Sequence, residues 1–165
     1  MRILGIDPAL RITGIGIVDF SEKQAQLVTS GVIRTAPDQS VPKKLQTLYE
    51  ETLRLIRTYR PDAVALEKVF VHAHHPTTAF ILGQARGSIC LACAQADKHV
   101  MEFAATQVKK AIVGRGQASK EQVQRMVVSL LGLSAVPRYN DVTDALALAL
   151  TFHYQHRHGV PADTR

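Results

Sequence analysis

Cysteine is scarce in this sequence, and its scarcity limits the metal chemistry that the chain can support. Among 165 residues only Cys90 and Cys93 are cysteines. A four-cysteine structural zinc site is excluded, because it needs a second cysteine pair. His72, His74 and His75 could complete a mixed site, but the segment SICLACAQA is typical of the apolar interior of a helix. We therefore predict buried thiols for the cysteines and a solvated loop for the histidines.

Long apolar runs, repeats and low-complexity linkers are also missing. No apolar stretch approaches the roughly 20 residues that a helix needs to span a bilayer. The first residues, MRILGID, are typical of a β-strand rather than of a signal peptide, so we expect a cytoplasmic protein. The length favours one compact domain with a sizeable core. We assign this domain to residues 1–155 and a polar, flexible tail to residues 156–165.

Positive charge exceeds negative charge in the composition. The chain carries 20 Lys and Arg against 14 Asp and Glu, a formal net charge of +6. Such a charge attracts polyanions such as nucleic acid, acidic membranes or phosphorylated substrates, although many proteins without such partners are also basic. With 46% hydrophobic and 21% charged residues, a disordered chain is excluded for most of the length.

β-prone segments open the chain and later alternate with helical patterns. Turn-forming residues separate the first three segments, which predicts an antiparallel meander. Strands followed by alternating strands and helices indicate an α/β fold, a mixed sheet covered by helices on its faces. We expect strands at residues 2–7, 12–20, 26–35, 62–67 and 99–103, and helices between Pro42 and Pro61, at 77–97, at 106–114, after Ser119 and from Asn140.

Small residues mark the second of these helices. Ala79, Gly83, Gly87 and Ala94 fall on nearly one face. Glycine in a helix costs about 1 kcal/mol relative to alanine, and close packing against another helix would compensate for that cost. A dimer interface would supply the partner.

Four carboxylates stand where a fold could bring them together. Asp7 and Glu67 each end an apolar β-prone segment, ILGID and AVALE. Asp141 and Asp144 are three residues apart at the start of the last helix, so they share one helical face. Hydrolysis of a phosphodiester requires charge neutralisation around the phosphorus, and carboxylate oxygens hold the hard divalent cations suited to it. The acids indicate a metal-dependent hydrolytic site, provided that basic side chains do not neutralise them.

Each acid also has a purely structural interpretation. Asp7 precedes Pro8 and could simply start a turn, Glu67 could lie exposed at a strand end, and Asp141 could cap the helix. Asp144 is harder to explain in this way, because it borders the apolar segment ALALAL and needs a ligand or hydrogen-bonded partner. Taken singly, the two interpretations of each acid have about even support.

Five motifs follow one another in a specific order along the chain: GIDPALRITGIGIVD, AVALEKVF, LGQARG, FAATQVKK and NDVTDALALAL. Together they resemble the RuvC family of Holliday-junction resolvases over residues 1–154. The resemblance implies an RNase H-like fold with a mixed five-stranded sheet flanked by helices. It also implies a nuclease that resolves four-way junctions in recombination and repair by paired, symmetric, metal-dependent cuts, which leave 5′-phosphate and 3′-hydroxyl ends. Ala9 departs from the family, which usually has glycine there.

The resemblance further assigns roles to particular residues. The four acids Asp7, Glu67, Asp141 and Asp144 would bind Mg²⁺ or Mn²⁺, and we expect two ions per site, with Asp7 between them. Lys120 would steady charge on the scissile phosphate.

Other residues would contact DNA, which is a four-way junction in this family. The aromatic ring of Phe70 would stack near unstacked bases, and Lys109 would position the strand, with further charge from Lys110 and Arg115. Without the family, Phe70 would be a core residue and the basic run an ordinary solvated face. The family also implies a homodimer that acts with the RuvA and RuvB branch-migration proteins.

Two other functions fit part of the sequence. A phosphotransferase of the actin and sugar-kinase type also opens with a strand containing GID, but it requires a second phosphate-binding glycine hairpin that this sequence lacks. A catalytically silent junction-binding scaffold would keep the basic residues, but it need not retain all four acids.

Overall fold

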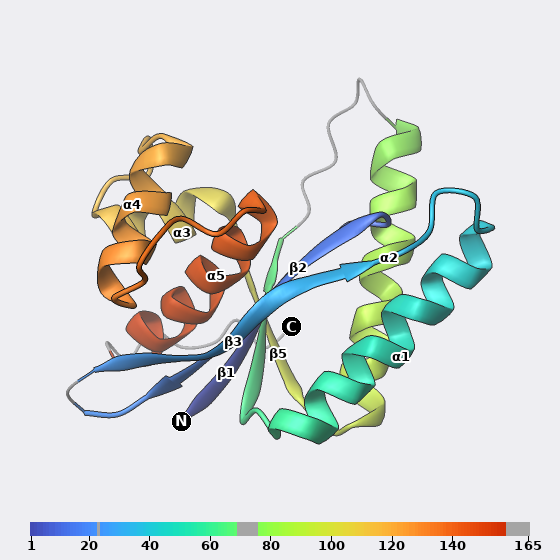
Figure 1. Cartoon of the computed structure of the whole chain (residues 1–165), viewed down its shortest axis with the longest axis horizontal. Helices are drawn as coiled ribbons and strands as arrows, with labels where there is room; N and C mark the ends of the chain where they lie inside the picture. The colour runs from blue at the N-terminus through green and yellow to red at the C-terminus, as the bar shows by residue number, and fades with distance from the viewer. Residues whose placement is uncertain (23, 69–75, 158–165) are drawn as a thin grey trace.

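The computed structural model describes residues 1–22, 24–68 and 76–157, which form one sheet between two groups of helices (Figure 1). The helices α1 and α2 cover one face of the sheet, and α3, α4 and α5 lie on the other. In chain order the elements are β1 (Arg2–Asp7), β2 (Ile12–Phe20), β3 (Ala25–Arg34), α1 (Val41–Tyr59), β4 (Ala63–Glu67), α2 (Pro76–Gln95), β5 (His99–Phe103), α3 (Ala105–Val113), α4 (Lys120–Leu130) and α5 (Asn140–Arg157).

The sheet is mixed, with the strand order β3-β2-β1-β4-β5. The first three strands form the predicted antiparallel meander, and β4 and β5 add parallel strands beside β1. Because β1 and β4 are parallel neighbours, their carboxyl ends meet at the same edge of the sheet. Ile6 pairs with Leu66, so Asp7 and Glu67 follow side by side at that edge.

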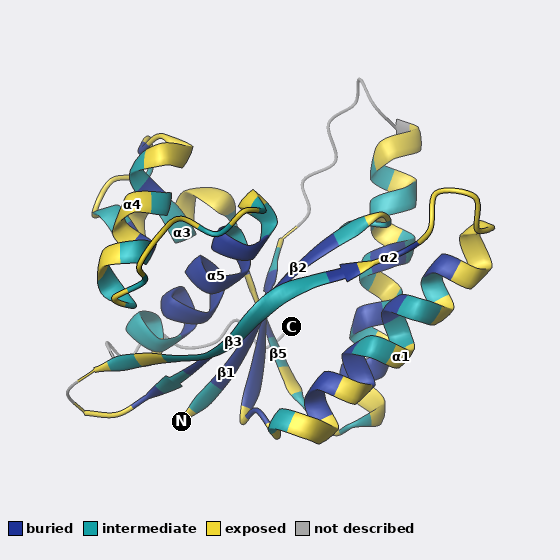
Figure 2. Cartoon of the chain, viewed as in Figure 1, coloured by how far each residue is buried: buried dark blue, intermediate teal, exposed yellow. Residues whose placement is uncertain are grey.

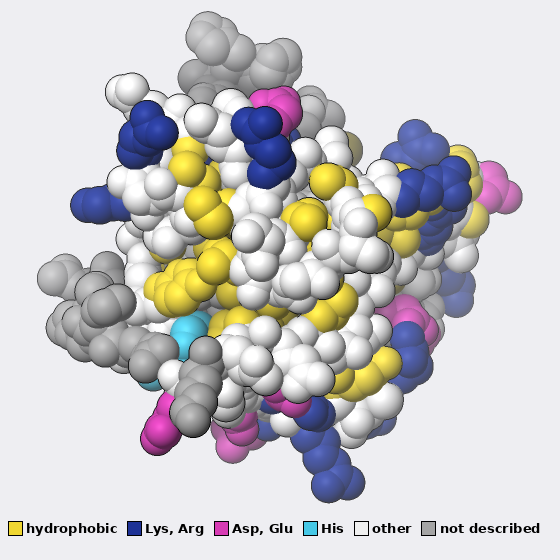
Figure 3. Space-filling view, turned by 60° about the vertical axis from the view of Figure 1, so that its left-hand side comes forward, with side chains coloured by type: hydrophobic (Ala, Val, Ile, Leu, Met, Phe, Trp, Pro, Cys, Tyr) yellow, Lys and Arg dark blue, Asp and Glu magenta, His cyan; other side chains and the backbone are white. Residues whose placement is uncertain are grey.

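Two hydrophobic cores lie on the two faces of the sheet. Alternate side chains of each strand point to opposite faces, so Leu4 and Ile6 of β1 join the core under α1 and α2, whereas Ile3 joins the core under α5. Helix α5 is buried without interruption from residue 145 to 150, as its apolar sequence predicts (Figure 2). Figure 3 shows the outer surface on the α3–α5 side, where apolar side chains gather across the middle and most lysines and arginines lie toward the margins.

Local sequence signals end α3 and begin α4. Gly114 follows α3 with a φ of 82°, a left-handed conformation that glycine adopts without strain. Ser119 and Gln122 form the predicted capping box, in which the Ser119 hydroxyl accepts a hydrogen bond from the Gln122 backbone N–H and the Gln122 side chain accepts one from the Ser119 N–H. This cap fixes Lys120 as the first residue of α4.

Several predicted boundaries were wrong by one or two residues. The third strand covers residues 25–34 instead of 26–35. The second helix stops at Gln95, because Asp97 turns the chain with a φ of 51°. The last helix continues through Arg157, past the predicted tail boundary at residue 156, and residues 158–165 lie outside the described part of the chain.

The cysteine prediction is confirmed for Cys93, whose side chain is fully buried in the α2 core, whereas Cys90 is half-buried. Burial raises the pKa of the Cys93 thiol to about 12, which keeps it protonated. His72, His74 and His75 lie outside the described residues. None of the described helices is both long and apolar enough to cross a membrane.

The close approach of α5 to the sheet predicts a stability defect in Gly5→Ala. A methyl group at Gly5 would overlap the backbone carbonyl oxygen of Ala145, which cannot rotate away. We expect urea denaturation to show a loss of about 1 to 3 kcal/mol in the free energy of unfolding. Gly31→Ala in β3 is the matched control, because its methyl group would meet no atom within 4 Å. Equal stability of the two variants would contradict this account of the packing.

Candidate active site

The ends of β1 and β4 form one side of a cleft at the edge of the sheet. Pro8 follows Asp7 directly and has no backbone N–H to continue the strand ladder. Asp7 and Glu67 both line this cleft, which has a volume of about 300 Å³. Two of the acids that are 60 positions apart in the sequence therefore share one site.

Helix α5 brings the other two acids to this edge. Gly14 of β2 pairs with Asp7, and a Cβ atom at Gly14 would overlap the backbone carbonyl of Asp141. The missing side chain therefore lets the first turn of α5 lie directly on the sheet. Asp144 lines the cleft, whereas Asp141 stands beside it, near enough to act electrostatically on Asp7.

Lysine side chains from two further helices complete the cleft. Lys120 Nζ lies 2.7 Å from Asp144 Oδ2 and forms an ion pair with it. Lys109 of α3 also lines the cleft. The acids are therefore not free of basic partners: one of the four is paired, and this neighbour raises the pKa of Lys120.

Burial and the charge of neighbouring acids raise the pKa values of Asp7 and Glu67. Burial, followed by the negative charges of Glu67, Asp144 and Asp141, raises the pKa of Asp7 to about 8. Burial and the charge of Asp144 also raise the pKa of Glu67, although a hydrogen bond with Asp7 and the charge of Lys120 oppose the shift. One lysine therefore compensates only part of the negative charge in the cleft.

The chemistry of these side chains fits a divalent cation. Carboxylate oxygens are hard donors, and a cation between them would remove the repulsion that raises their pKa values. As the side chains lie, no three His, Cys, Asp or Glu residues within the described ranges are gathered closely enough to hold an ion together. Asp144 Oδ2 is paired with Lys120 in this arrangement.

The predicted DNA-contacting residues do not all reach the cleft. Lys109 and Lys120 line it, whereas Lys110 at the end of α3 and Arg115 in the following loop are exposed and are not part of its wall. Phe70 lies outside the described residues.

The cleft also has an apolar wall, which was not predicted from the sequence. Helices α3, α4 and α5 supply this wall, and the apolar periodicity of these helices was its only signal in the sequence. Its residues are Ala105, Val108, Val123 and Leu148.

The turn after Asp7 accommodates alanine where a glycine is usual. Ala9 has no positive φ, so its methyl group costs nothing in backbone strain. The Thr13 hydroxyl closes the turn by donating to the Ala9 carbonyl at 2.6 Å and accepting from the Ala9 N–H at 3.1 Å. The position of Asp7 is thus compatible with the substitution.

Comparison with known proteins shows similarity to one family over nearly the whole chain. A family model described as "Crossover junction endodeoxyribonuclease RuvC" matches residues 3–153. A protein of that name from Paraburkholderia phymatum is 48% identical over 159 residues, which cover 96% of this chain and 84% of the relative. One from Dechloromonas aromatica is 46% identical over 158 residues, again covering 96% of this chain and 85% of the relative.

Solved structures show the same likeness. RuvC of Thermus thermophilus superposes with a TM-score of 0.90 at 33% identity, covering 98% of this chain and 99% of the other. The T. thermophilus protein in complex with a Holliday junction substrate superposes with a TM-score of 0.91 at 34% identity, covering 96% of both chains. The yeast mitochondrial resolvase Ydc2, at 11% identity and a TM-score of 0.69 over 95% of this chain and 80% of its own, shares the fold.

The raised pKa of Asp7 predicts how stability depends on pH when divalent cations are chelated. The folded protein keeps a proton on Asp7 up to a pH of about 8, whereas the unfolded chain releases it near pH 3.8. This proton stabilises the fold fully below pH 3.8, and the contribution is lost as the pH rises toward 8. Asp7→Asn should therefore gain melting temperature relative to the wild type between pH 4 and 8.

Thermal denaturation in chelator, followed by circular dichroism across this pH range, measures the difference. Asp38→Asn is the control, because Asp38 is exposed in the loop before α1. A pH-independent difference between Asp7→Asn and the wild type would refute the assignment. Added magnesium or manganese should raise the melting temperature of the wild type more than that of Asp7→Asn.

Proposed function

Since the chain belongs to the RuvC family of crossover junction endodeoxyribonucleases, we propose that it resolves Holliday junctions by hydrolysing phosphodiester bonds in the cleft between β1, β4 and α5. The protein is a nuclease, and its family is generally metal-dependent. One observation supports this cleft above any other: three acids from three different elements converge on it, and burial together with the charge of neighbouring acids raises the pKa values of Asp7 and Glu67. Carboxylates held in such proximity are suited to a divalent cation beside a phosphate.

Asp7, Glu67, Asp141 and Asp144 would hold magnesium or manganese, with two ions per site. Such ions neutralise charge on the phosphate and stabilise the attacking and leaving oxygens of an in-line displacement. Water supplies the new P–O bond as the P–O3′ bond breaks, and the released 3′ oxygen takes up a proton, so the products carry 5′-phosphate and 3′-hydroxyl ends.

Lys120 has a second role in this proposal. Lys120 neutralises Asp144 in the free protein. On substrate binding it turns toward the scissile phosphate, which is negatively charged like the Asp144 carboxylate. Lys109, on the adjacent wall, positions the strand through its backbone phosphate. The two lysines thereby compensate negative charge both in the free protein and in the protein bound to DNA.

Asp7→Asn separates cutting from binding. We expect this variant to lose cleavage of a labelled four-way junction, because it removes the acid that the others surround. Its binding to the junction in chelator should stay near the wild-type value, since Asp7 already carries a proton below a pH of about 8 in the metal-free protein and asparagine leaves that charge unchanged. Gel assays with and without magnesium or manganese measure both quantities, and Asp38→Asn is the charge-matched control. Appreciable nicking by Asp7→Asn would reject the proposed site, and cutting by the wild type in chelator would reject the metal dependence.

We further propose that the active form is a homodimer joined through α2. A four-way junction offers two equivalent strands related by a twofold axis, and two identical sites would cut them symmetrically. One face of α2 is apolar or small and exposed, with Phe80 67% and Leu91 61% accessible and with Gly83, Gly87 and Ala94 between and beyond them. Packing against a second copy would bury this face. Action with RuvA and RuvB, and in the cytoplasm, stays a prediction from the family resemblance.

Leu91→Glu tests the dimer. A charge on this face would have to be buried without a partner, so we expect the variant to be monomeric at concentrations where the wild type is dimeric. Light scattering should then give the wild type twice the 18.1 kDa of one chain and the variant that single mass. Val136→Glu is the control, because Val136 is a similarly exposed apolar residue in the loop before α5. A wild type that is monomeric at working concentration would count against the dimer.

A further inference from the structure

Two arginines share one tyrosine ring just before α5. The guanidinium carbon of Arg34, the last residue of β3, lies 4.7 Å from the centre of the Tyr139 ring. The guanidinium carbon of Arg138 lies 5.6 Å from the same centre. Both distances fall within the roughly 6 Å range of a cation–π interaction. The ring therefore holds two positive charges close together at the surface.

Within the part of the chain that the structure describes, neither of these arginines forms an ion pair with an acid. The ion pairs among the described residues involve Arg2, Arg54, Arg86 and Lys120, and none involves Arg34 or Arg138. Both side chains belong to exposed residues. Arg11 adds a third exposed charge next to them, since its carbonyl accepts a hydrogen bond from the N–H of Thr35, the residue after Arg34. Like charges gathered without counterions repel one another, and a polyanion would offset that repulsion.

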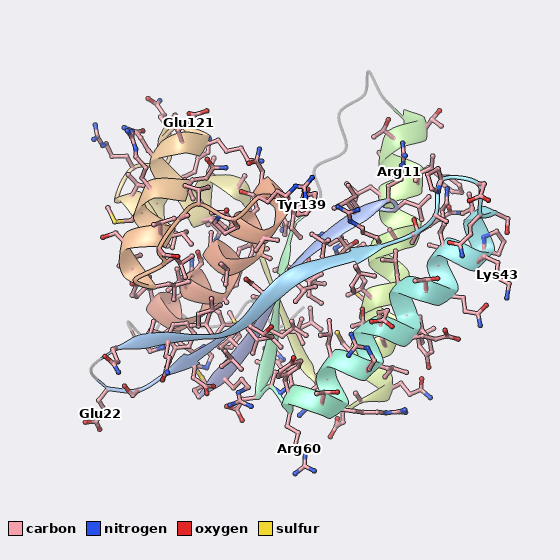
Figure 4. All side chains as sticks on the ribbon, in the orientation of Figure 1. Arg11, Glu22, Lys43, Arg60, Glu121 and Tyr139 are labelled. Carbon is pink, nitrogen blue, oxygen red and sulfur yellow. The ribbon has the colours of Figure 1, made fainter. Side chains whose placement is uncertain are left out.

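This cluster flanks the active site on the side opposite its lysines. Gly14 of β2 pairs with Asp7 on one side and with Val32 of β3 on the other, two residues before Arg34. Tyr139 lies two residues before Asp141 and at the same end of the sheet as Arg11 (Figure 4). Lys109 lies in α3, which begins directly after β5 at the edge of the sheet opposite β3, and Lys120 lies in α4, which packs against α3. Positive charge therefore stands on both sides of the cleft.

We propose that Arg34, Arg138 and Tyr139, together with Arg11, form a second DNA-backbone site that binds phosphates of a duplex arm next to the cleaved strand. This inference rests on the proposed function and adds to it the direction in which the substrate crosses the protein, from the α3–α4 side over the acids to the end of β3. Guanidinium groups suit phosphate because their fork of donors matches its oxygens. The ring orients both groups, which lowers the conformational entropy lost when they bind.

The test is the salt dependence of junction binding by Arg34→Gln/Arg138→Gln. Each phosphate contact on duplex DNA contributes about −0.9 to the slope of log affinity against log salt, so two lost contacts should make the slope shallower by about 1.8. Between 50 and 200 mM salt, the wild type should then lose about 12-fold more affinity than the variant. Fluorescence anisotropy in chelator measures this without cleavage.

Two control variants keep the result specific. Arg57→Gln/Arg60→Asn removes the same charge from the end of α1. Figure 4 shows Arg60 at the opposite end of the molecule from Tyr139. Asparagine is chosen at position 60 because it tolerates the left-handed conformation of Arg60, with its φ of 49°. This control should keep the wild-type slope. Arg34→Lys/Arg138→Lys keeps the charge and should keep most of the slope, whereas a merely structural role would let lysine fail like glutamine.

The failures of the two proposals are distinguishable. A glutamine variant with the wild-type slope, in a protein that binds and cuts the junction, overturns only the second DNA site. If the slope becomes equally shallow in Arg57→Gln/Arg60→Asn, the second DNA site is also overturned, because the effect would then reflect net charge alone. A wild type that neither binds nor cuts the junction overturns the proposed function and this inference together.

Discussion

The contact between α5 and the sheet determines where the proposed active site forms. A helix that carries two acids in its first turn can bring them to strand ends only if its backbone lies directly on the sheet. Gly5, Gly14 and Gly16 make this possible, because a side chain at any of them would meet backbone or side-chain atoms of α5. Burial of the whole apolar stretch of α5 provides the free energy that holds it there. Core packing on one face of the sheet therefore determines where the acids of α5 lie relative to the strand ends.

That packing brings like charges together at a cost. Asp7 is half-buried beside three other acids, and burial together with their charge raises its pKa, so its ionised form is disfavoured in the free protein. Lys120 offsets part of the repulsion through Asp144, and the capping box that begins α4 fixes the backbone of this lysine. The remaining excess of negative charge would be offset by a cation in the cleft.

The sequence predicted most of the fold because its signals are local. β-prone runs and the turn-forming residues between them predicted the bounds of β1 and β2, and the pair Ser119 and Gln122 located the start of α4. The family resemblance indicated which four acids belong together, and the RNase H-like fold that it implied is confirmed by the T. thermophilus structures. Helix ends were less predictable, because the position at which α2 stops depends on the left-handed turn at Asp97.

Features that depend on contacts between distant residues could not be predicted from the sequence. The pairing of Lys120 with Asp144 needs the angle between α4 and α5, and no periodicity encodes that angle. Arg34 and Arg138 are 104 positions apart and meet only because Tyr139 lies over the end of β3.

The two groups of basic residues differ in chemistry, and this difference suits their distances from the reacting phosphate. A lysine close to the acids can exchange a carboxylate for a phosphate, because its ammonium group is a compact charge on a flexible stem. Arginines oriented by an aromatic ring are less free to move and cannot make that exchange with an acid that they do not contact. If DNA binds as proposed, mobile charge beside the acids and fixed charge beyond them would allow the strand to adjust within the cleft while an arm of the junction stays in place.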